Sequence, residues 1–425
     1  MYVCGPTVYD RAHLGNARSV VVYDILFRLL CNIYGEDKVV YVRNITDVDD
    51  KINARAKEDN TTIQKLTTEV TGWFHEDMGA LNVLRPTYEP RATQHIAQMV
   101  TLITALIERE QAYVSQGHVL FAVDQFDGYG ILSGRKLEDL QAGARIEVGD
   151  YKRHPGDFVL WKPANEGDDP SSVFDSPWGA GRPGWHIECS AMSMHYLGDT
   201  FDIHGGGADL MFPHHENEIA QSCASGDHIG FARIWVHNGF LTVDGEKMSK
   251  SLGNFITVKD LLDKGIHGEV IRLALMMTKY NEPLDFSEKL LGDAKKALDS
   301  FYRKIADVET QSESAGEPGE AFMSALADDM NVPKALSLMH AASGAELKAM
   351  GELMGFFTVS SDEWFKGPAL SGGTGEADIL DAIEKRKQAK ADKDFALADR
   401  IRDELLEKGV VLEDKPGGIV EWRRS

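Results

Sequence analysis

The sequence predicts an α/β fold: a doubly wound, parallel-sheet (Rossmann-like) domain with an α+β insertion, followed by a helical bundle and a small C-terminal module. Three patterns predict it. Tyr2-Val3-Cys4 reads as a short buried strand that Gly5-Pro6 breaks, and a segment with helical periodicity follows at about 17–34. Val39-Val40-Tyr41-Val42 then supplies a second apolar strand, as a doubly wound sheet requires. After Asn254 the pattern is helical almost to the end.

The segments between these patterns complete the predicted domains. Residues 61–110 are helical in pattern, 112–164 mix strand-like runs with polar turns, and 201–204 and 234–237 resemble strands that return to the first sheet. Segments 311–320 and 367–375 are rich in Gly and Ser and are the predicted linkers. We therefore expect a split Rossmann-like domain at 1–84 and 184–245, a connective insertion at 85–183, a lysine-loop region at 246–289, a helical bundle at 290–365 and a C-terminal module at 376–425.

Composition limits the function classes. A net charge of -22 repels polyanions and argues against indiscriminate nucleic-acid binding, although cations gather locally in the last fifty residues, interleaved with acids. No stretch approaches the roughly 18 apolar residues of a membrane span, and no basic region followed by an apolar one opens the chain. We expect a cytoplasmic protein without a membrane partner. Its four cysteines favour free thiols or metal ligands over disulfides.

The densest cluster of metal-ligand residue types lies between residues 184 and 218. Gly184-Trp185-His186-Ile187-Glu188-Cys189 is followed by Pro213-His214-His215-Glu216-Asn217-Glu218. Zinc takes thiolate, imidazole and carboxylate ligands, and His214 and Glu218 stand at a spacing that places them on one helical face. The cluster is not a metalloprotease helix, because Ile219 occupies the position where the second histidine is required.

Two further segments are suited to binding phosphates. His13-Leu14-Gly15-Asn16 stands where the first loop enters the first helix, a place that favours anions; Gly15 permits close approach, and His13 and Asn16 can donate hydrogen bonds. Lys247-Met248-Ser249-Lys250-Ser251 follows a predicted β-hairpin at 240–245, whose Asp-Gly supplies the turn. Two lysines on a loop suit a polyphosphate that is gripped and then released. Together the segments resemble the paired signature of class I aminoacyl-tRNA synthetases.

A glycine run stands between them. In His204-Gly205-Gly206-Gly207-Ala208-Asp209, three glycines directly after a predicted strand indicate close backbone approach. We interpret Gly205, Gly206 and Gly207 as a platform for the adenosine of ATP, with Asp209 available for a hydroxyl or an amino group. The alternative is a flexible turn.

At more positions the sequence resembles cysteinyl-tRNA synthetases. The similar segments are 1–10, 43–47, 184–189, 201–218 and 247–254 in the catalytic region, and 393–403 with 422–424 in the tail. The resemblance implies a catalytic Rossmann-like domain, a stem-contact region around the lysine loop, an anticodon-binding type of bundle and a tRNA-recognition module at the end. Members of that family usually begin before the strand that here starts at Met1, so we expect the start to be truncated or placed late.

The resemblance also implies a metal. In that family Cys4, Cys189, His214 and Glu218 match the ligands of one zinc ion per chain, which takes the thiol of the substrate. The chemistry agrees, because cysteine and serine differ by one atom and zinc greatly prefers a soft thiolate to a neutral hydroxyl. Thr46 and Trp185 are then expected to close the pocket around the small substrate.

The activity that the resemblance implies is ATP-dependent ligation of L-cysteine to tRNA(Cys) through a cysteinyl-adenylate. We expect the protein to be a monomer. His13 and Asn16 would stabilise the α-phosphate transition state, while Lys247 and Lys250 hold the departing phosphates. Mg²⁺ is expected on the pyrophosphate.

Two alternatives remain open at this point. A ligase of the mycothiol pathway, which joins cysteine to an amino sugar, shares the catalytic fold, the zinc and the lysine loop. It lacks a carboxylate where Glu218 stands and does not carry the tail. The second alternative is a non-catalytic zinc- and tRNA-binding paralogue, which has no need of both phosphate-binding segments.

Overall fold

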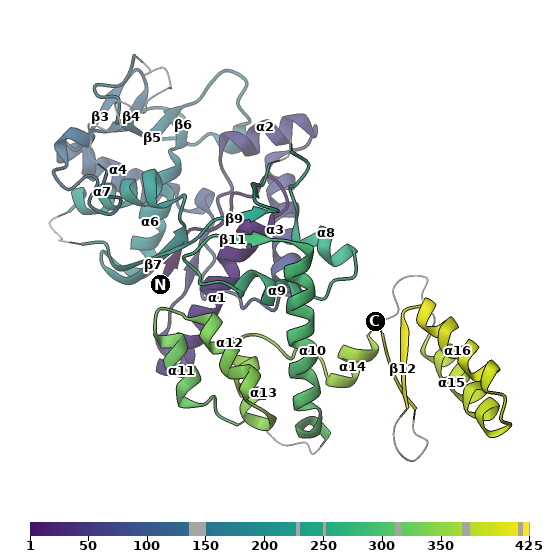
Figure 1. The fold of residues 1–425 in the computed structure, drawn as a ribbon. Coiled ribbons are helices and arrows are strands. Elements are labelled where there is room, and N and C mark those ends of the chain that lie inside the picture. The colour runs from purple at the N-terminus through teal and green to yellow at the C-terminus, as the bar shows by residue number, and fades with distance from the viewer. Residues whose placement is uncertain are drawn as a thin grey trace.

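The computed structural model describes residues 1–135, 150–226, 230–249, 252–310, 316–367, 375–414 and 420–424. At its centre lies a four-stranded sheet in the order β2-β1-β7-β8, in which all neighbours pair in parallel (Figure 1). Its strands are β1 (Tyr2–Val3), β2 (Val42–Arg43), β7 (Phe201–Gly207) and β8 (Ala232–Asn238). The predicted α/β class and both returning strands are confirmed.

The second strand differs from its prediction. It comprises Val42–Arg43, whereas the sequence placed it at residues 39–42. Tyr41 pairs elsewhere: its N–H donates to Thr87 Oγ1 at 3.0 Å, and its carbonyl accepts the N–H of Tyr88 at 3.1 Å. The apolar run therefore marks burial correctly, but only its end joins the sheet.

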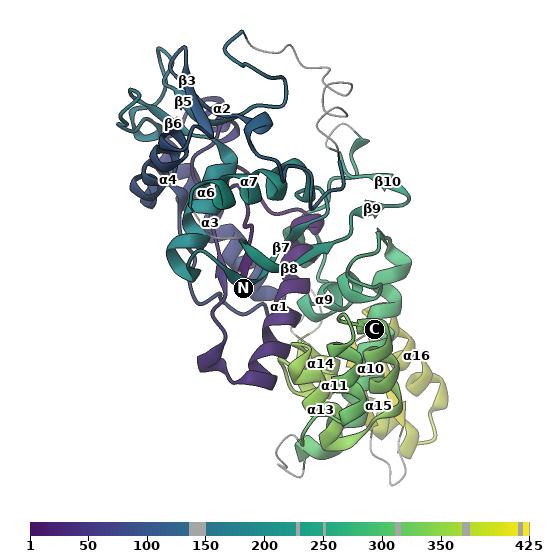
Figure 2. The ribbon, with the colours of Figure 1, turned by 90° about the vertical axis from the view of Figure 1, so that its left-hand side faces the viewer.

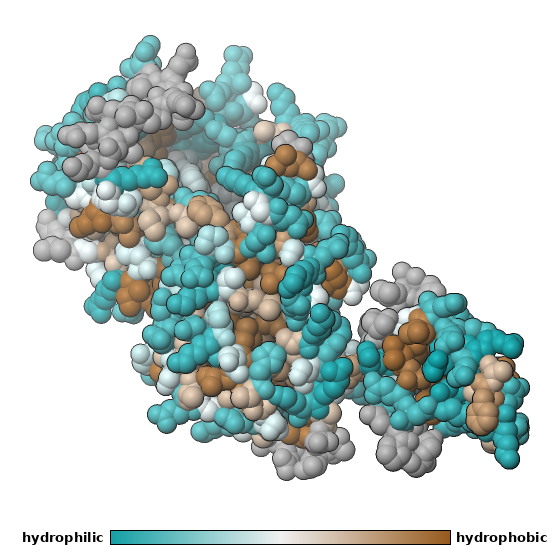
Figure 3. All heavy atoms as spheres, in the orientation of Figure 1, coloured by the Kyte–Doolittle hydropathy of each residue, from teal (hydrophilic) through white to brown (hydrophobic). Residues whose placement is uncertain are grey.

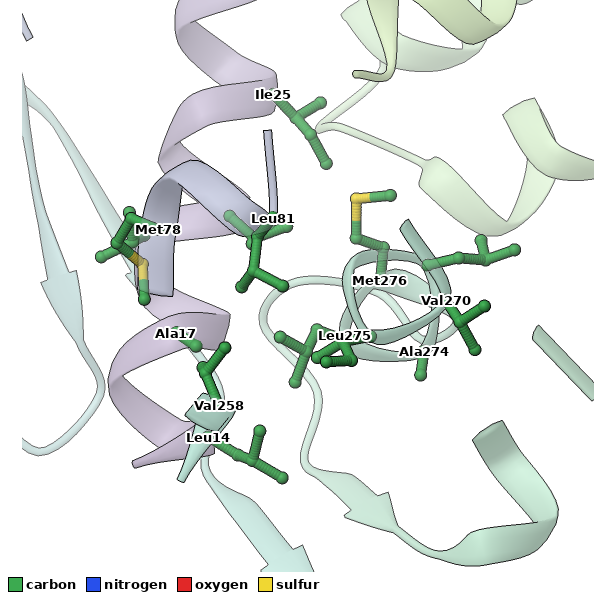
Figure 4. Packing of buried hydrophobic residues seen from close by; sticks show 14 of the residues in the cluster. Leu14, Ala17, Ile25, Met78, Leu81, Val258, Val270, Ala274, Leu275 and Met276 are labelled. Carbon is green, nitrogen blue, oxygen red and sulfur yellow. The ribbon is translucent and has the colours of Figure 1, made fainter. Parts of the chain in front are cut away.

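The helix after β1 anchors the largest core. This helix, α1 (Leu14–Tyr34), begins earlier than its periodicity predicted because the His13 side chain caps it, accepting the N–H groups of Gly15 and Asn16. Its buried face packs against α3 (Ile63–Ala80) and α9 (Gly268–Met276), as Figure 4 shows for Leu14, Ala17 and Ile25. The short helix α2 (Asp50–Glu58) precedes α3.

The predicted helical stretch 61–110 is interrupted. Between α3 and α4 (Ile96–Glu108) the chain runs beside β2 and the residues that follow it. It accepts hydrogen bonds from Arg43 N–H to Tyr88 O at 3.1 Å and from Ile45 N–H to Pro90 O at 2.8 Å. Proline cannot donate to a helix, so this segment extends the sheet edge instead. The insertion then forms an antiparallel sheet, β3-β4-β5-β6, from Ala112–Ser115, His118–Phe121, Phe158–Pro163 and Gly181–Pro183.

The chain returns from the insertion through α6 (Trp185–Leu197). After β7 an irregular helical turn, Met211–His215, leads directly into α7 (Glu216–Ala224). The two segments rich in metal-ligand residue types thus lie on α6 and at the start of α7, which pack against each other.

A second small sheet carries the first lysine of the lysine loop. Its order is β10-β9-β11, from Glu246–Lys247, Leu241–Val243 and Leu284–Phe286. The predicted hairpin is confirmed, and its turn residues Asp244 and Gly245 have φ values of 50° and 80°. The strand β11 was not predicted, because it lies in a region of helical pattern. Figure 2 shows β9 and β10 beyond the ends of β7 and β8.

Further helices occupy the range predicted for the bundle, at the end of the central sheet away from the insertion (Figures 1 and 2). They are α10 (Glu288–Thr310), α11 (Glu320–Ala327), α12 (Val332–Ala341), α13 (Gly344–Leu353) and α14 (Ser361–Lys366). The short helix α8 (Val258–Asp263) lies before them, in the range predicted for the lysine-loop region. Of the predicted linkers, residues 311–315 and 368–374 lie outside the described residues.

The C-terminal module has a small core of its own. It consists of α15 (Glu376–Ala391), α16 (Phe395–Glu407) and an antiparallel hairpin of β12 (Val410–Asp414) and β13 (Val420–Arg424), which the helical pattern did not predict. Ile379, Ile383, Leu405, Val410 and Trp422 form its core. On the face that Figure 3 shows, its surface is mostly hydrophilic around a small hydrophobic patch. No described helix in the whole protein is long and apolar enough to cross a membrane.

Candidate active site

A cavity of about 450 Å³ opens at the carboxyl ends of the central strands. The end of β1, the start of α1, the end of β7 and the β9–β10 hairpin all contribute to its wall, as expected for a doubly wound sheet. Most of the predicted site residues line it: Cys4, His13, Gly15, Asn16, Thr46, Trp185, Cys189, Gly207, Asp209, His214 and Lys247. Lys250 lies outside the described residues.

One end of the cavity brings four potential metal ligands together. One donor atom each from Cys4, Cys189, His214 and Glu218 lies within 4.8 Å of the other three. The Sγ atoms of the cysteines are 3.6 Å apart, Cys4 Sγ is 3.4 Å from Glu218 Oε1, and His214 Nε2 is 3.1 Å from the same oxygen. Cys4, Cys189 and His214 face the cavity, whereas Glu218 closes the cluster from behind.

These separations fit a single metal ion. Donors bound at zinc distances in tetrahedral geometry are separated from each other by about 3.3–3.8 Å. His214 Nε2 is buried and has no hydrogen-bond partner, since its contact with Glu218 is close but poorly aligned. An orphaned imidazole nitrogen that points into a group of sulfur and oxygen donors is the arrangement that a bound zinc ion explains.

The electrostatics of the cluster favour a positive charge at its centre. Burial opposes ionisation of Glu218, yet the imidazoles of His204 and His214 hold the pKa of its carboxyl well below its usual range. A hydrogen bond from Cys4 lowers the pKa of the Cys189 thiol to about 6, against the effect of burial. Burial also opposes a charge on His214, but Glu218 raises its pKa to about 10. The site therefore provides anionic donors and stabilises a cation.

Further histidines surround these ligands. His204 Nε2 lies 2.8 Å from Glu218 Oε2, His186 Nδ1 lies 2.9 Å from His214 Nδ1, and His215 Nδ1 lies 2.8 Å from His237 Nε2. His214 and Glu218, both predicted to bind metal, thus each have an imidazole partner. This partner fixes the orientation of the side chain. Cys4, His204, His215 and Glu218 form a second, overlapping group of possible donors.

The start of α1 presents a neutral histidine to the cavity. His13 Nδ1 accepts the N–H groups of Gly15 at 3.1 Å and Asn16 at 3.3 Å, and burial lowers the pKa of His13. The proton of the neutral ring is therefore on Nε2, which is left to donate to a ligand. Asn16 Oδ1 accepts the His13 N–H at 3.3 Å, so the Asn16 amide nitrogen remains for the same purpose.

The lysine loop lies over this helix start. Met248 closes over Gly15: a Cβ added to Gly15 would lie 3.4 Å from the Met248 methyl group. Lys247 is exposed at the end of the hairpin and lines the cavity, so its ammonium group is available to an anionic ligand.

The glycine run divides into two parts. Gly207 and Asp209 line the cavity, whereas Gly205 and Gly206 are packed beneath it. A Cβ on Gly205 would lie 2.3 Å from the Tyr23 ring, and one on Gly206 would lie 2.9 Å from the His215 ring. Their lack of side chains allows close packing against Tyr23 of α1 and against His215.

The two predicted substrate residues flank the cluster. Trp185 is 42% exposed and its ring lies 4.3 Å from that of His214. Thr46 is buried and donates to Glu188 Oε2 at 3.0 Å. Burial and the nearby Cys189 raise the pKa of Glu188 well above its usual range, so a neutral acid lies behind Thr46.

Sequence reasoning missed two residues that support the site from α1. Tyr23 lies beneath the glycine run, with its hydroxyl 2.8 Å from Gly206 O and 2.6 Å from Val236 O. Arg18 reaches the segment that leads into the lysine hairpin and donates to Phe240 O at 2.6 Å. The signal for Arg18 was a charged residue within the apolar pattern of a helix.

Comparison with known proteins agrees with this geometry. The family model of the class I (C) tRNA synthetase catalytic domain matches residues 1–296. A cysteine–tRNA ligase of Paramagnetospirillum magneticum is 54% identical over 444 residues, covering 100% of this chain and 95% of the relative. One of Acidiphilium cryptum is 55% identical over 435 residues, covering 100% and 94%.

The fold is also shared by a protein whose sequence is much less similar. The methionyl-tRNA synthetase of Mycobacterium tuberculosis, solved with methionyl-adenylate, superimposes with a TM-score of 0.55 at 15% identity and covers 83% of each chain, which shows a shared fold. Together with the full-length relatives and the matching catalytic-domain model, the comparison is decisive: this chain belongs to the cysteine–tRNA ligase family of class I aminoacyl-tRNA synthetases.

Proposed function

We propose that this protein ligates L-cysteine to tRNA(Cys) at the expense of ATP, through a cysteinyl-adenylate. The observation that supports this proposal most is that one cavity is lined both by potential metal ligands and by groups suited to binding phosphates. The substrate thiol would lie at the Cys4–Cys189–His214 end, and the phosphates at the His13–Asn16 end. The carboxylate between them would then meet the α-phosphate.

We assign Cys4, Cys189, His214 and Glu218 as ligands of one zinc ion. A bound zinc ion supplies a strong preference for thiolate over hydroxyl, which distinguishes cysteine from serine. Trp185, packed on His214, covers this end of the cavity from solvent, and Thr46 borders it.

The other groups bind ATP and move with its phosphates. We assign the Nε2–H of His13 and the amide of Asn16 to the α-phosphate, and Lys247 and Lys250 to the departing pyrophosphate with Mg²⁺. Gly207 and Asp209 would contact the adenosine. The protein supplies position and charge, while the cysteine carboxylate is the nucleophile that displaces pyrophosphate. The terminal adenosine of tRNA then takes the cysteinyl group.

We further propose that the C-terminal module at 376–425 and the bundle at 290–365 bind the tRNA. The module has its own core, which suits a separate recognition unit. Full-length similarity to cysteine–tRNA ligases, tail included, favours this function over ligation to an amino sugar. The buried Glu218 carboxylate within the donor cluster favours it as well.

Two assays with the purified protein test the proposal. We expect cysteine-dependent exchange of pyrophosphate into ATP, with serine as a poor substitute, and charging of tRNA(Cys) with cysteine. Ligation of cysteine to an amino sugar without tRNA charging would identify the amino-sugar ligase instead. Absence of any ATP turnover would leave only a binding protein and overturn the proposal.

A further inference from the structure

Arg18 is a fully buried arginine that binds two segments far away in the chain. It is 0% exposed and lies on α1, in the turn that follows the His13 cap. Its guanidinium donates to the carbonyls of Gly239 at 2.9 Å and Phe240 at 2.6 Å. It also donates to the carbonyls of Lys279 at 3.2 Å and Glu282 at 2.6 Å, and its Nη2 lies 3.2 Å from Thr278 Oγ1.

These two segments are the roots of the sheet that carries Lys247. Residues 239–240 join β8 to β9, and residues 277–283 join α9 to β11. Both β10, which ends at Lys247, and β11 pair with β9. The roots touch closely at Gly239, where an added Cβ would lie 2.3 Å from Glu282 O. Arg18 therefore ties both entrances of this sheet to α1.

The segment that follows the lysine loop is also tied to α1. The Leu14 N–H donates to Ile256 O at 3.0 Å, and the His13 ring contacts that of Phe255 at a centroid distance of 5.3 Å. Val258, at the start of α8, belongs to the same core as Leu14 (Figure 4). The chain thus contacts α1 at residues 239–240, before the lysine loop, and again at residues 255–258, after it.

The bonding of Arg18 is unusual for a buried cation. In the part of the chain that the structure describes, its hydrogen-bond partners are carbonyl and hydroxyl oxygens, and burial lowers its pKa to about 10. The other arginine at 0% exposure on an element of this core, Arg272, is instead paired with a carboxylate, that of Asp24. Burying a charge without a counter-charge contributes little to stability. The burial of Arg18 therefore indicates that it positions the segments it binds.

We infer that Arg18 is a positioning residue for the activation step: it fixes the base of the lysine hairpin relative to the phosphate-binding start of α1. The inference rests on the proposed function. His13 and Asn16 hold the phosphates from α1, and Lys247 holds them from the hairpin. The distance between the two groups is set where the hairpin joins α1, and Arg18 makes that junction.

Arg18→Lys tests this role, because lysine keeps the charge but cannot bind both roots. We expect the kcat of cysteine-dependent pyrophosphate exchange to fall by about 10- to 100-fold, since misplacement by about 1 Å has effects of this size. Transfer of cysteine from preformed enzyme-bound adenylate to tRNA should stay within about twofold of the wild type, because pyrophosphate has already left. Zinc content should not change.

Arg272→Lys is the matched control. It also removes a buried guanidinium that binds backbone carbonyls, those of Met354 and Leu81, but it does not touch the hairpin. We expect it to lower thermal stability and leave both steps near wild-type rates. Gly239→Ala gives a second route, because its Cβ must separate the two roots while Arg18 remains; it should slow activation and not transfer.

The results separate the inference from the proposed function. Wild-type exchange rates in Arg18→Lys would overturn the inference, as would equal slowing of activation and transfer, or the same kinetic pattern in Arg272→Lys. If Arg18→Lys does not fold, Gly239→Ala decides by the same criteria. Lack of cysteine-dependent exchange in the wild-type protein would instead overturn the proposed function.

Discussion

The Sγ atoms of Cys4 and Cys189 lie 3.6 Å apart although 185 residues separate them in the chain. Cys4 follows β1, and Cys189 lies on α6, which begins directly after the insertion. A metal ion held by both would therefore close the Rossmann-like domain across the inserted segment. With the metal bound, ligand chemistry and domain closure would depend on the same pair of thiols.

We predict that Cys189→Ser removes the metal. Wild-type protein should hold about one zinc ion per chain, and the variant well below half of that, because serine does not provide a thiolate. Elemental analysis after gel filtration measures this directly. Cys31→Ser, on the half-exposed face of α1, is the control and should keep its zinc. Stoichiometric zinc in Cys189→Ser would contradict the ligand assignment.

The two functions of His13 can be separated by substitution. Asparagine can also cap a helix, so His13→Asn should keep the cap and lose only the Nε2–H donor. We expect a fall in kcat for pyrophosphate exchange of about 10²-fold, with a small change in stability. His13→Ala should lose the cap as well, with about 1 kcal/mol of additional destabilisation. Urea unfolding and exchange kinetics measure the two effects; equal exchange rates in wild type and His13→Asn would refute the donor role.

Local patterns predicted much of this fold, and contacts between distant segments account for the rest. The apolar character of Tyr2 and Val3 predicts β1, and the turn preference of Asp244-Gly245 predicts the hairpin. The start of β2 was misplaced because Tyr41 bonds to Thr87 and Tyr88, which no local pattern reveals.

The site divides in the same way. Its donors are recognisable by residue type, and the structure brings Cys4, Cys189, His214 and Glu218 together as the family resemblance implied. Arg18 escaped prediction because most of its partners are backbone carbonyls, which every residue possesses. Its role depends on which carbonyls the fold delivers.

The buried pair of Asp24 and Arg272 should be important for stability. Asp24 also accepts hydrogen bonds from Arg28 Nε and from the Leu84 N–H, each at 2.8 Å, so it joins α1 to the segment after α3. Asp24→Asn leaves Arg272 without its counter-charge and should reduce the free energy of unfolding by about 3–5 kcal/mol. The control is Asp202→Asn, in an exposed pair with Arg233, where we expect about 0.5 kcal/mol or less. Similar losses in both variants, measured by urea unfolding, would show that the buried pair has no special weight.

Asp77 should make stability depend on pH. Burial raises the pKa of this carboxyl from 3.8 to about 6, although Arg11 opposes the shift from 3.2 Å. Between these values the folded protein keeps a proton that the unfolded chain releases, so this contribution to stability is present below pH 3.8 and is lost as pH rises through about 6. The free energy of unfolding of Asp77→Asn, measured relative to that of the wild type, should therefore increase as pH rises from about 4 to 6. Parallel profiles of the two proteins in this range would contradict the assignment.

The separate core of the C-terminal module predicts that the two halves of the reaction can be uncoupled. The module packs through Ile379, Leu405 and Trp422 on itself, and none of its described residues lines the cavity. A chain that ends at residue 367 should therefore keep cysteine-dependent pyrophosphate exchange within about twofold, because activation needs only the cavity. Its kcat/KM for charging tRNA should fall at least about tenfold, since loss of several phosphate contacts weakens binding by this much or more.

Because α14 contacts β13, circular dichroism must first show that the shortened chain keeps its helices. Charging at the wild-type rate by such a chain would show that the module does not contribute to tRNA recognition, and a parallel loss of exchange would show that it supports the catalytic domain instead.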